Sequence, residues 1–123
     1  MKLHDDVWQV IENYLLERTG ITAPDGLREW AEDNLDITPF DGGAFIADGN
    51  EFDLFVVLER RGRWNIRGQV TKFLSTMGRK HGTLVAKIYE DNLPSLRLAK
   101  HFGFREVGRD GDMIRLESTS WAA

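Results

Sequence analysis

The chain has 123 residues, of which 41% are hydrophobic and 29% charged, with a net charge of −4, and this composition predicts one soluble globular domain over residues 1–123 and excludes a disordered chain. It contains no cysteine, which excludes disulfides, thiol nucleophiles and thiolate metal sites and favours a reducing cytoplasm. The N-terminal segment has acidic residues where a signal peptide needs an apolar core, so export is not expected. No apolar run approaches the ~20 residues of a membrane span. An acidic chain is also a poor general nucleic-acid binder.

Two amphipathic helices are predicted at the N-terminus. Apolar side chains recur at helical spacing over residues 5–18, and Gly20 is expected to end this helix. The second helix is expected to begin with Thr22 as its N-cap and Pro24 in its first turn. Its buried face is expected to hold Leu27, Trp30, Ala31 and Leu35.

Three short strands follow, over residues 37–40, 44–47 and 52–58. They are separated by Asp-Gly-Gly and Asp-Gly-Asn, which is hairpin-turn chemistry and predicts an antiparallel meander. Residues 52–58 are apolar on both faces, which is typical of a strand near the middle of a sheet.

The second half of the sequence alternates helices and strands. A central helix is predicted over 68–80, closed by His81-Gly82, then a strand over 83–89 and a helix over 92–102. A C-terminal hairpin is expected from strands 104–107 and 113–116, turning at residues 109–111. The fold class is therefore mixed α/β, and the strand–helix–strand crossover implies a parallel pair. Residues 83–89 and 104–107 are expected to lie side by side in one β-layer.

The segment from Tyr89 to Phe104 carries a motif. Asn92, Ser95, Leu98, Gly103 and Phe104 form the pattern Asn-x-x-Ser-x-x-Leu-x-x-x-x-Gly-Phe. This pattern resembles the signature that ends the cofactor half of GNAT-type N-acetyltransferases. One position departs, because Ala99 stands where such enzymes usually carry a tyrosine. The resemblance implies the GNAT-like acyl-CoA N-acyltransferase fold and acetyl-CoA as co-substrate. The resemblance also implies that Asn92 contacts the cofactor and that Ser95 could reach it. The alternative for Asn92 is a plain helix N-cap, and the alternative for Ser95 is a position in the first helical turn without a ligand.

The loop before the central helix would bind the cofactor's pyrophosphate if the resemblance holds. Backbone N–H groups and a helix N-terminus suit a dianion, and glycines let the backbone approach it. Here the two glycine positions of the family read Asn65 and Arg67, although Gly68 lies one residue later. The segment is basic, so it could pair with phosphates or form a solvated face. The implied cofactor residues are Arg60, Arg61, Arg63, Asn65, Ile66, Arg67 and Gly68.

Acetyl transfer needs a base for the amine and an acid for the leaving thiolate. Glu59, at the end of the strand before the loop, is the best base candidate by position, although it could equally pair with a neighbouring arginine. With Ala99 unable to donate a proton, Tyr89 and His101 are the nearest substitutes, and His101 is expected to face away from the Ala99 side of its helix. The three histidines have no metal-site spacing, so no metal is expected.

Two functional hypotheses follow from the resemblance. The first is an acetyl-CoA-dependent N-acetyltransferase acting on a small-molecule or protein amine. The second is a catalytically degenerate GNAT-fold protein with a binding or structural role, similar to small proteins of this kind from tailed bacteriophages. An enzyme would need an open V-shaped cleft between the strands that end at Leu58 and start at Thr83. An exposed Trp121 or an unpaired sheet edge would support a homodimer.

Overall fold

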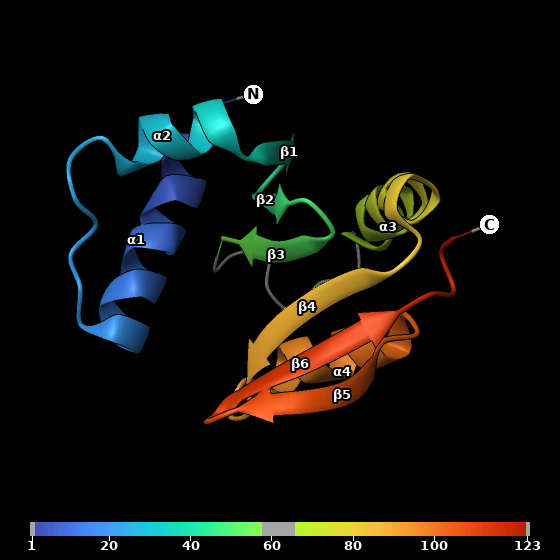
Figure 1. The fold of residues 1–123 in the computed structure, drawn as a ribbon. Coiled ribbons are helices and arrows are strands. Elements are labelled where there is room, and N and C mark those ends of the chain that lie inside the picture. The colour runs from blue at the N-terminus through green and yellow to red at the C-terminus, as the bar shows by residue number, and fades with distance from the viewer. Residues whose placement is uncertain (1, 58–65, 123) are drawn as a thin grey trace. The chain divides into compact units, whose positions relative to one another are not determined.

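The computed structural model describes residues 2–57 and 66–122. Figure 1 shows the elements in the order α1 (Asp5–Thr19), α2 (Leu27–Asn34), β1 (Asp36–Phe40), β2 (Gly43–Asp48), β3 (Glu51–Val56), α3 (Arg67–His81), β4 (Leu84–Tyr89), α4 (Leu93–His101), β5 (Arg105–Asp110) and β6 (Met113–Ser118). The strands form one six-stranded sheet in the order β1-β2-β3-β4-β6-β5, so the predicted mixed α/β class is confirmed and β3 is an interior strand. None of the helices in the described part of the chain has the length and hydropathy needed to cross a bilayer.

The described residues fall into two compact units. The first holds the chain up to Asp48 together with the described residues between Leu54 and Gln69, and the second holds Gly49–Asp53 and the chain from Val70 onward. The strand β3 therefore contributes residues to both units.

The first helix forms as its sequence pattern predicts. Asp5 and Asp6 lie in its first turn, where negative charge interacts favourably with the helix dipole. Val7 and Ile11 are its buried residues. It ends at Gly20, whose φ of 70° is left-handed and whose N–H donates to the carbonyl of Leu16 at 3.0 Å.

The second helix begins later than predicted. The expected N-cap at Thr22 is wrong, because the N-cap is Gly26, with a φ of 86° that interrupts any helix begun earlier. The N–H of Leu27 donates to the carbonyl of Pro24 at 3.2 Å, so the residues before the helix form a turn instead. The expected burial of Trp30 is also wrong, since its relative exposure is 54%.

The core of the first unit lies between α1 and the β1–β2 hairpin. Its hairpin register runs from the pair Asp36–Ala47 to the pair Phe40–Gly43, which leaves a two-residue turn. Gly43 is required at that turn, because a Cβ there would lie 2.6 Å from the carbonyl oxygen of Phe55. The buried cluster consists of Leu3, Val7, Ile11, Ile37, Ala44 and Val57.

The second unit contains a parallel pairing between β3 and β4. Glu51 of β3 is in register with Val85 of β4, and the N–H of Val85 donates to the carbonyl of Asn50 at 2.9 Å. Phe52 of β3 contacts the rings of Phe73 and Phe104 at centroid distances of 5.2 and 5.8 Å. These contacts join β3 to α3 and to the start of the C-terminal hairpin.

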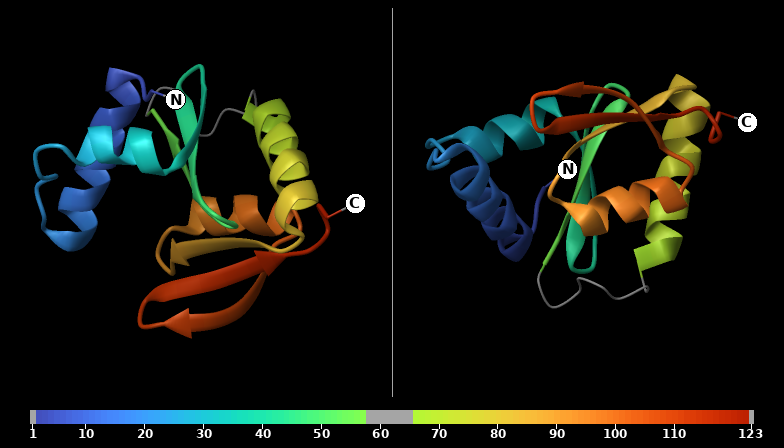
Figure 2. Two further views of the ribbon diagram at one scale, coloured as in Figure 1. Left: turned by 45° about the horizontal axis from the view of Figure 1, so that its top comes forward. Right: turned by 90° about the horizontal axis from the view of Figure 1, so that it is seen from below.

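The C-terminal hairpin corrects one expectation about the sheet. The segments 83–89 and 104–107 belong to the same sheet but are not neighbours, because β6 lies between β4 and β5 (Figure 2). The strand β6 is antiparallel to both, with Leu84–Ser118 to Tyr89–Met113 as its register with β4. The two-residue turn of the hairpin is Gly111-Asp112, later than the predicted turn at 109–111. The pairing of β5 with β6 has a register shift between Glu106 and Gly108. The strand β5 continues to Asp110, beyond its predicted end at residue 107.

The tail after β6 packs back onto the second unit. The indole N–H of Trp121 donates to the carbonyl of Phe102 at 2.9 Å, and the backbone of Trp121 lies against Gly78 of α3. A Cβ at position 78 would overlap that backbone, so the glycine permits the contact. Trp121 therefore packs against this unit.

Candidate functional site

The motif residues Asn92 and Ser95 lie together at the junction between β4 and α4. Asn92 is the N-cap of α4, and its side-chain oxygen accepts from the N–H of Ser95 at 3.4 Å. The chain turns here because the N–H of Asn92 donates to the carbonyl of Tyr89 at 2.9 Å, and Pro94 occupies the first helical turn, where no N–H partner is needed. Both motif side chains are half-buried.

The end of the motif has a structural role. Gly103 has a φ of 89°, and a Cβ there would lie 2.8 Å from the hydroxyl of Ser120. The N–H of Phe104 then donates to the carbonyl of Ala99 at 3.0 Å, and the Phe104 side chain is buried. Gly103 thus allows a tight turn, and Phe104 supplies an aromatic side chain to the core.

The candidates for proton donation occupy different places. Tyr89 is the last residue of β4, half-buried and in register with Met113 of β6. His101 is the exposed last residue of α4, and its ring packs edge-on against Phe102 at 5.2 Å. Ala99 is half-buried on the same helix.

Most of the predicted cofactor loop falls outside the described residues. This applies to the base candidate Glu59 and to four loop candidates, Arg60, Arg61, Arg63 and Asn65. Ile66 lies half-buried directly before α3, Arg67 is the exposed first residue of that helix, and Gly68 is exposed with open space around it. The first turn of α3 contains no acidic residue, and a helix N-terminus of this kind suits an anion.

A carboxylate that the sequence reasoning missed lies on the interior strand β3. Burial and, second, the negative charge of Glu51 raise the pKa of Asp53 to about 6, while Lys87 lowers it. The amino nitrogen of Lys87 lies 3.2 Å from the carboxylate of Glu51. Asp53 is surrounded by neighbouring atoms yet its side chain is open to water, so solvent screens these charges and weakens their effect.

The sequence did contain a signal for Asp53. It is the single charged residue within the apolar run from Phe52 to Leu58, on a strand expected in the middle of the sheet. A carboxylate whose pKa lies near neutrality is suited to proton transfer, which makes Asp53 a second candidate base beside Glu59.

No metal site accompanies these residues. Within residues 2–57 and 66–122, no three histidine or carboxylate side chains gather closely enough to hold a metal ion.

Comparison with known proteins identifies the fold. No protein-family model and no curated protein sequence matches the chain. Three solved structures match at a TM-score of 0.68. Ribosomal-protein-alanine N-acetyltransferase from Brucella melitensis is 16% identical, and the match covers 90% of each chain. The protein yncA from Salmonella typhimurium, solved with its cofactor acetyl-CoA, is 17% identical over 94% of this chain and 88% of its own.

The third structure is a mutant of the spermidine N-acetyltransferase SpeG from Vibrio cholerae. It is 15% identical to this chain, with 97% of this chain and 93% of the SpeG chain covered. At such low identity the likeness concerns the fold alone. It agrees with the motif resemblance at residues 92–104 and with the observed order of helices and strands. The chain therefore has the fold of the GNAT-type acetyltransferases.

Proposed function

We propose that this protein is an N-acetyltransferase that transfers the acetyl group of acetyl-CoA to the amine of a small molecule. The observation that carries the proposal is the junction between β4 and α4. There the motif residues Asn92 and Ser95 form a capped helix start, within a fold shared with acetyltransferases over nearly the whole chain. The same extent of coverage supports action as one domain, and the absence of cysteine fits a cytoplasmic enzyme.

The residues present fit an anionic, nucleotide-tailed thioester. The N-terminus of α3, where Arg67 and Gly68 lie, has no acidic residue in its first turn, and backbone N–H groups at a helix N-terminus suit an anion. The preceding segment adds the basic residues Arg60, Arg61 and Arg63, which suit phosphate oxygens. Asn92 would contact the pantetheine arm through its side-chain amide while its oxygen caps α4.

The proposed reaction removes protons from the nitrogen and delivers one to the sulfur. The ammonium group first loses a proton, and the neutral nitrogen attacks the thioester carbonyl carbon. The carbon–sulfur bond then breaks, the nitrogen loses its second proton as the amide forms, and the thiolate takes up a proton. Asp53 or Glu59 would accept the proton that the ammonium group loses, and the raised pKa of Asp53 places its proton exchange near neutral pH. Tyr89, three residues before Asn92, would give a proton to the thiolate, because Ala99 cannot.

A second candidate function is favoured by Ala99. This residue of α4 is half-buried, and its methyl side chain stands at the motif position where GNAT enzymes usually carry the tyrosine. A protein that keeps the cofactor-binding fold but lacks an efficient acid would bind acetyl-CoA without turning it over. Such a protein would act through binding alone.

The names of the similar structures offer two kinds of acceptor amine. The SpeG structure is that of a spermidine acetyltransferase, and the Brucella structure is named for a protein acceptor. We favour the small-molecule amine because the N-terminal helices of this chain are rich in carboxylates, which suit a cationic substrate.

Calorimetric titration and a transfer assay test the proposal together. We expect acetyl-CoA and CoA to bind, and mass spectrometry to detect acetylated product with spermidine or another small amine. The variant of the residue that acts as base, Asp53→Asn or Glu59→Gln, should lower turnover and leave the cofactor affinity unchanged. Asp112→Asn, which changes an exposed turn residue, is the control and should alter neither quantity. Binding without turnover for any amine would favour the second candidate, and no heat with either cofactor at millimolar concentration would overturn both.

A further inference from the structure

The strand β5 forms one edge of the six-stranded sheet. It pairs with β6 and, among the described residues, with no other strand (Figure 1). In an antiparallel pair, alternate residues direct their backbone N–H and C=O groups toward the neighbouring strand and the others direct them away. The outer side of β5 therefore presents backbone groups that can pair with a further strand.

The side chains of β5 are mostly charged. The strand reads Arg-Glu-Val-Gly-Arg-Asp, and every residue in it except Gly108 is exposed. Charged side chains commonly protect a sheet edge from pairing with another chain. That protection fails where the incoming strand carries the complementary order of charges, because opposite charges directly across two strands attract one another.

A β-bulge decides which charged side chains of β5 share a face of the sheet. The pairing with β6 shifts between Glu106 and Gly108, which leaves Val107 as the extra residue. In a regular strand, residues three apart lie on opposite faces. Here the Nε of Arg109 lies 2.8 Å from the carboxylate of Glu106, so the bulge has brought these two side chains onto the same face.

The two end residues of β5 share the other face. Arg105 and Asp110 are in register with Glu117 and Met113 of β6, which lie four residues apart and therefore point to one side. Neither Arg105 nor Asp110 makes a side-chain ion pair or hydrogen bond within the described residues. A cation and an anion thus stand at opposite ends of the edge with their charges uncompensated.

A second copy of β5, running antiparallel, matches this pattern. A two-fold axis through Gly108 places Arg105 opposite Asp110 of the second copy. The same axis places Glu106 opposite Arg109 of the second copy, because the bulge makes residues 106 and 107 count as one position of the ladder. Each match occurs twice by symmetry, which gives four pairs of opposite charge across the junction.

The charges also select the register of such a pairing. An axis through Glu106 would set this carboxylate against its own copy, and an axis through Arg109 would do the same with the guanidinium; both arrangements repel. The centre at Gly108 is open as well, since a Cβ built there meets nothing within 4 Å. Two strands can therefore approach closely at this point.

We propose that β5 pairs antiparallel with β5 of a second copy of this chain, so that the sheet continues across a two-fold symmetric dimer. A junction of six residues on each side buries little surface, so the dimer dissociates readily. The junction includes none of the residues proposed above for cofactor binding or catalysis, and the pairing is therefore independent of the transferase activity.

Sedimentation equilibrium of the full chain tests the proposal, over concentrations from about 10 µM to about 1 mM. We expect a monomer–dimer equilibrium with a dissociation constant on the order of 100 µM, and weaker association in about 0.5 M salt. Arg105→Asp and Asp110→Arg should each raise that constant about tenfold, because each sets like charges against one another at two symmetric positions.

The double variant Arg105→Asp/Asp110→Arg is the decisive measurement. It restores the opposite charges with their sides exchanged, so dimerisation should return to near the wild-type level. Arg97→Asp, which makes the same charge change at an exposed position of α4, is the control and should leave the dissociation constant unchanged.

Three results would overturn the pairing. The first is a wild-type chain that stays monomeric at about 1 mM. The second is undiminished dimerisation in single variants whose melting curves match the wild type. The third is a folded double variant that associates no better than the single variants, since the exchanged charges must attract if the two strands face each other.

Discussion

Replacing Asn92 separates a structural role of the β4–α4 junction from a cofactor-binding role. The Asn92 side chain caps α4 by accepting from the N–H of Ser95, at a distance of 3.4 Å that is long for such a bond. Asn92→Ala removes this acceptor and should cost about 0.5 kcal/mol, the low end for an N-cap, because the bond is long. For a chain of this length we expect the melting temperature to fall by about 2 °C.

The matched variant Asn92→Asp keeps the cap. Aspartate accepts from the same N–H, and its charge interacts favourably with the helix dipole, so the melting temperature should not fall. It cannot donate, however, because a carboxylate has no N–H group. If the Asn92 amide donates to acetyl-CoA, both variants should bind the cofactor about tenfold more weakly, the loss of one hydrogen bond.

Thermal melting and calorimetric titration with acetyl-CoA measure the two effects separately. Arg97→Gln, an exposed change in the middle of α4, is the control and should alter neither quantity. Wild-type cofactor affinity in Asn92→Asp would show that Asn92 is only a helix cap. An unchanged melting temperature in Asn92→Ala would refute the capping energy itself.

Two further predictions concern the second unit. The pKa of Asp53 is about 6 in the folded protein, above its ordinary value of 3.8, so the folded state holds the proton more tightly. The free energy of unfolding should therefore fall as the pH rises from about 4 to 6. At pH 7 we expect Asp53→Asn to be more stable than the wild type by about 1 kcal/mol, which is the full effect of the shift reduced for solvent screening. Urea unfolding at pH 4 and pH 7 measures this, and a difference that does not change with pH would contradict it. Gly78→Ala should lower the melting temperature, because the new Cβ overlaps the backbone of Trp121 and such overpacking costs about 1–3 kcal/mol. This cost opposes the helix propensity of alanine, which is about 1 kcal/mol more favourable than that of glycine. Gly108→Ala, which meets nothing within 4 Å, is its control, and a rise in melting temperature for Gly78→Ala would mean that the tail does not pack there.

Local patterns were sufficient to predict the type and order of the helices and strands. The helical spacing of apolar residues found α1 and α3, and their ends were marked by Gly20 and Gly82, both at positive φ. The Asn92 cap was also predicted, because the side-chain oxygen of an N-cap bonds within its own first turn. The start of α2 was missed, because Thr22 and Gly26 both provide a local signal for a helix start and only the packed structure selects between them.

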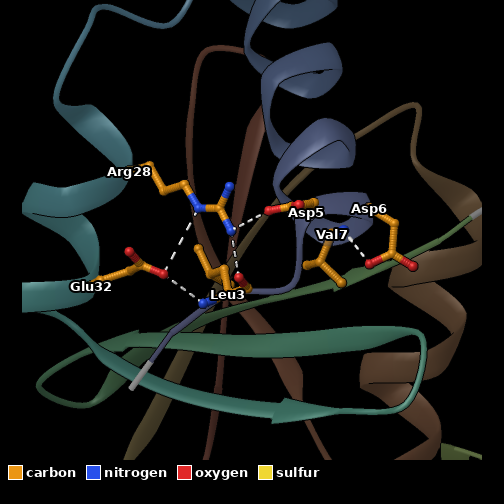
Figure 3. Close-up of polar contacts among 6 residues, drawn as sticks. All are labelled: Leu3, Asp5, Asp6, Val7, Arg28 and Glu32. Carbon is orange, nitrogen blue, oxygen red and sulfur yellow. Dashed lines mark hydrogen bonds and ion pairs between the residues drawn. The ribbon is translucent and has the colours of Figure 1, made fainter.

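Properties that depend on residues far apart in sequence were decided by the tertiary structure. The insertion of β6 between β4 and β5 follows from which strand edges meet across the sheet, and no local pattern records that choice. The pKa of Asp53 is raised by its burial and by Glu51 and is lowered by Lys87 of the neighbouring strand. Arg28 of α2 is held by Asp5 and Leu3 from the start of the chain (Figure 3).

The amino-acid sequence by itself determined the fold class and the position of the Asn-to-Phe motif, because backbone geometry and capping act over a few residues. Only the tertiary structure decided which strands are neighbours in the sheet and which carboxylate carries an unusual proton affinity. Charge and burial act through space, and folding brings side chains from separate parts of the chain within a few ångströms of one another.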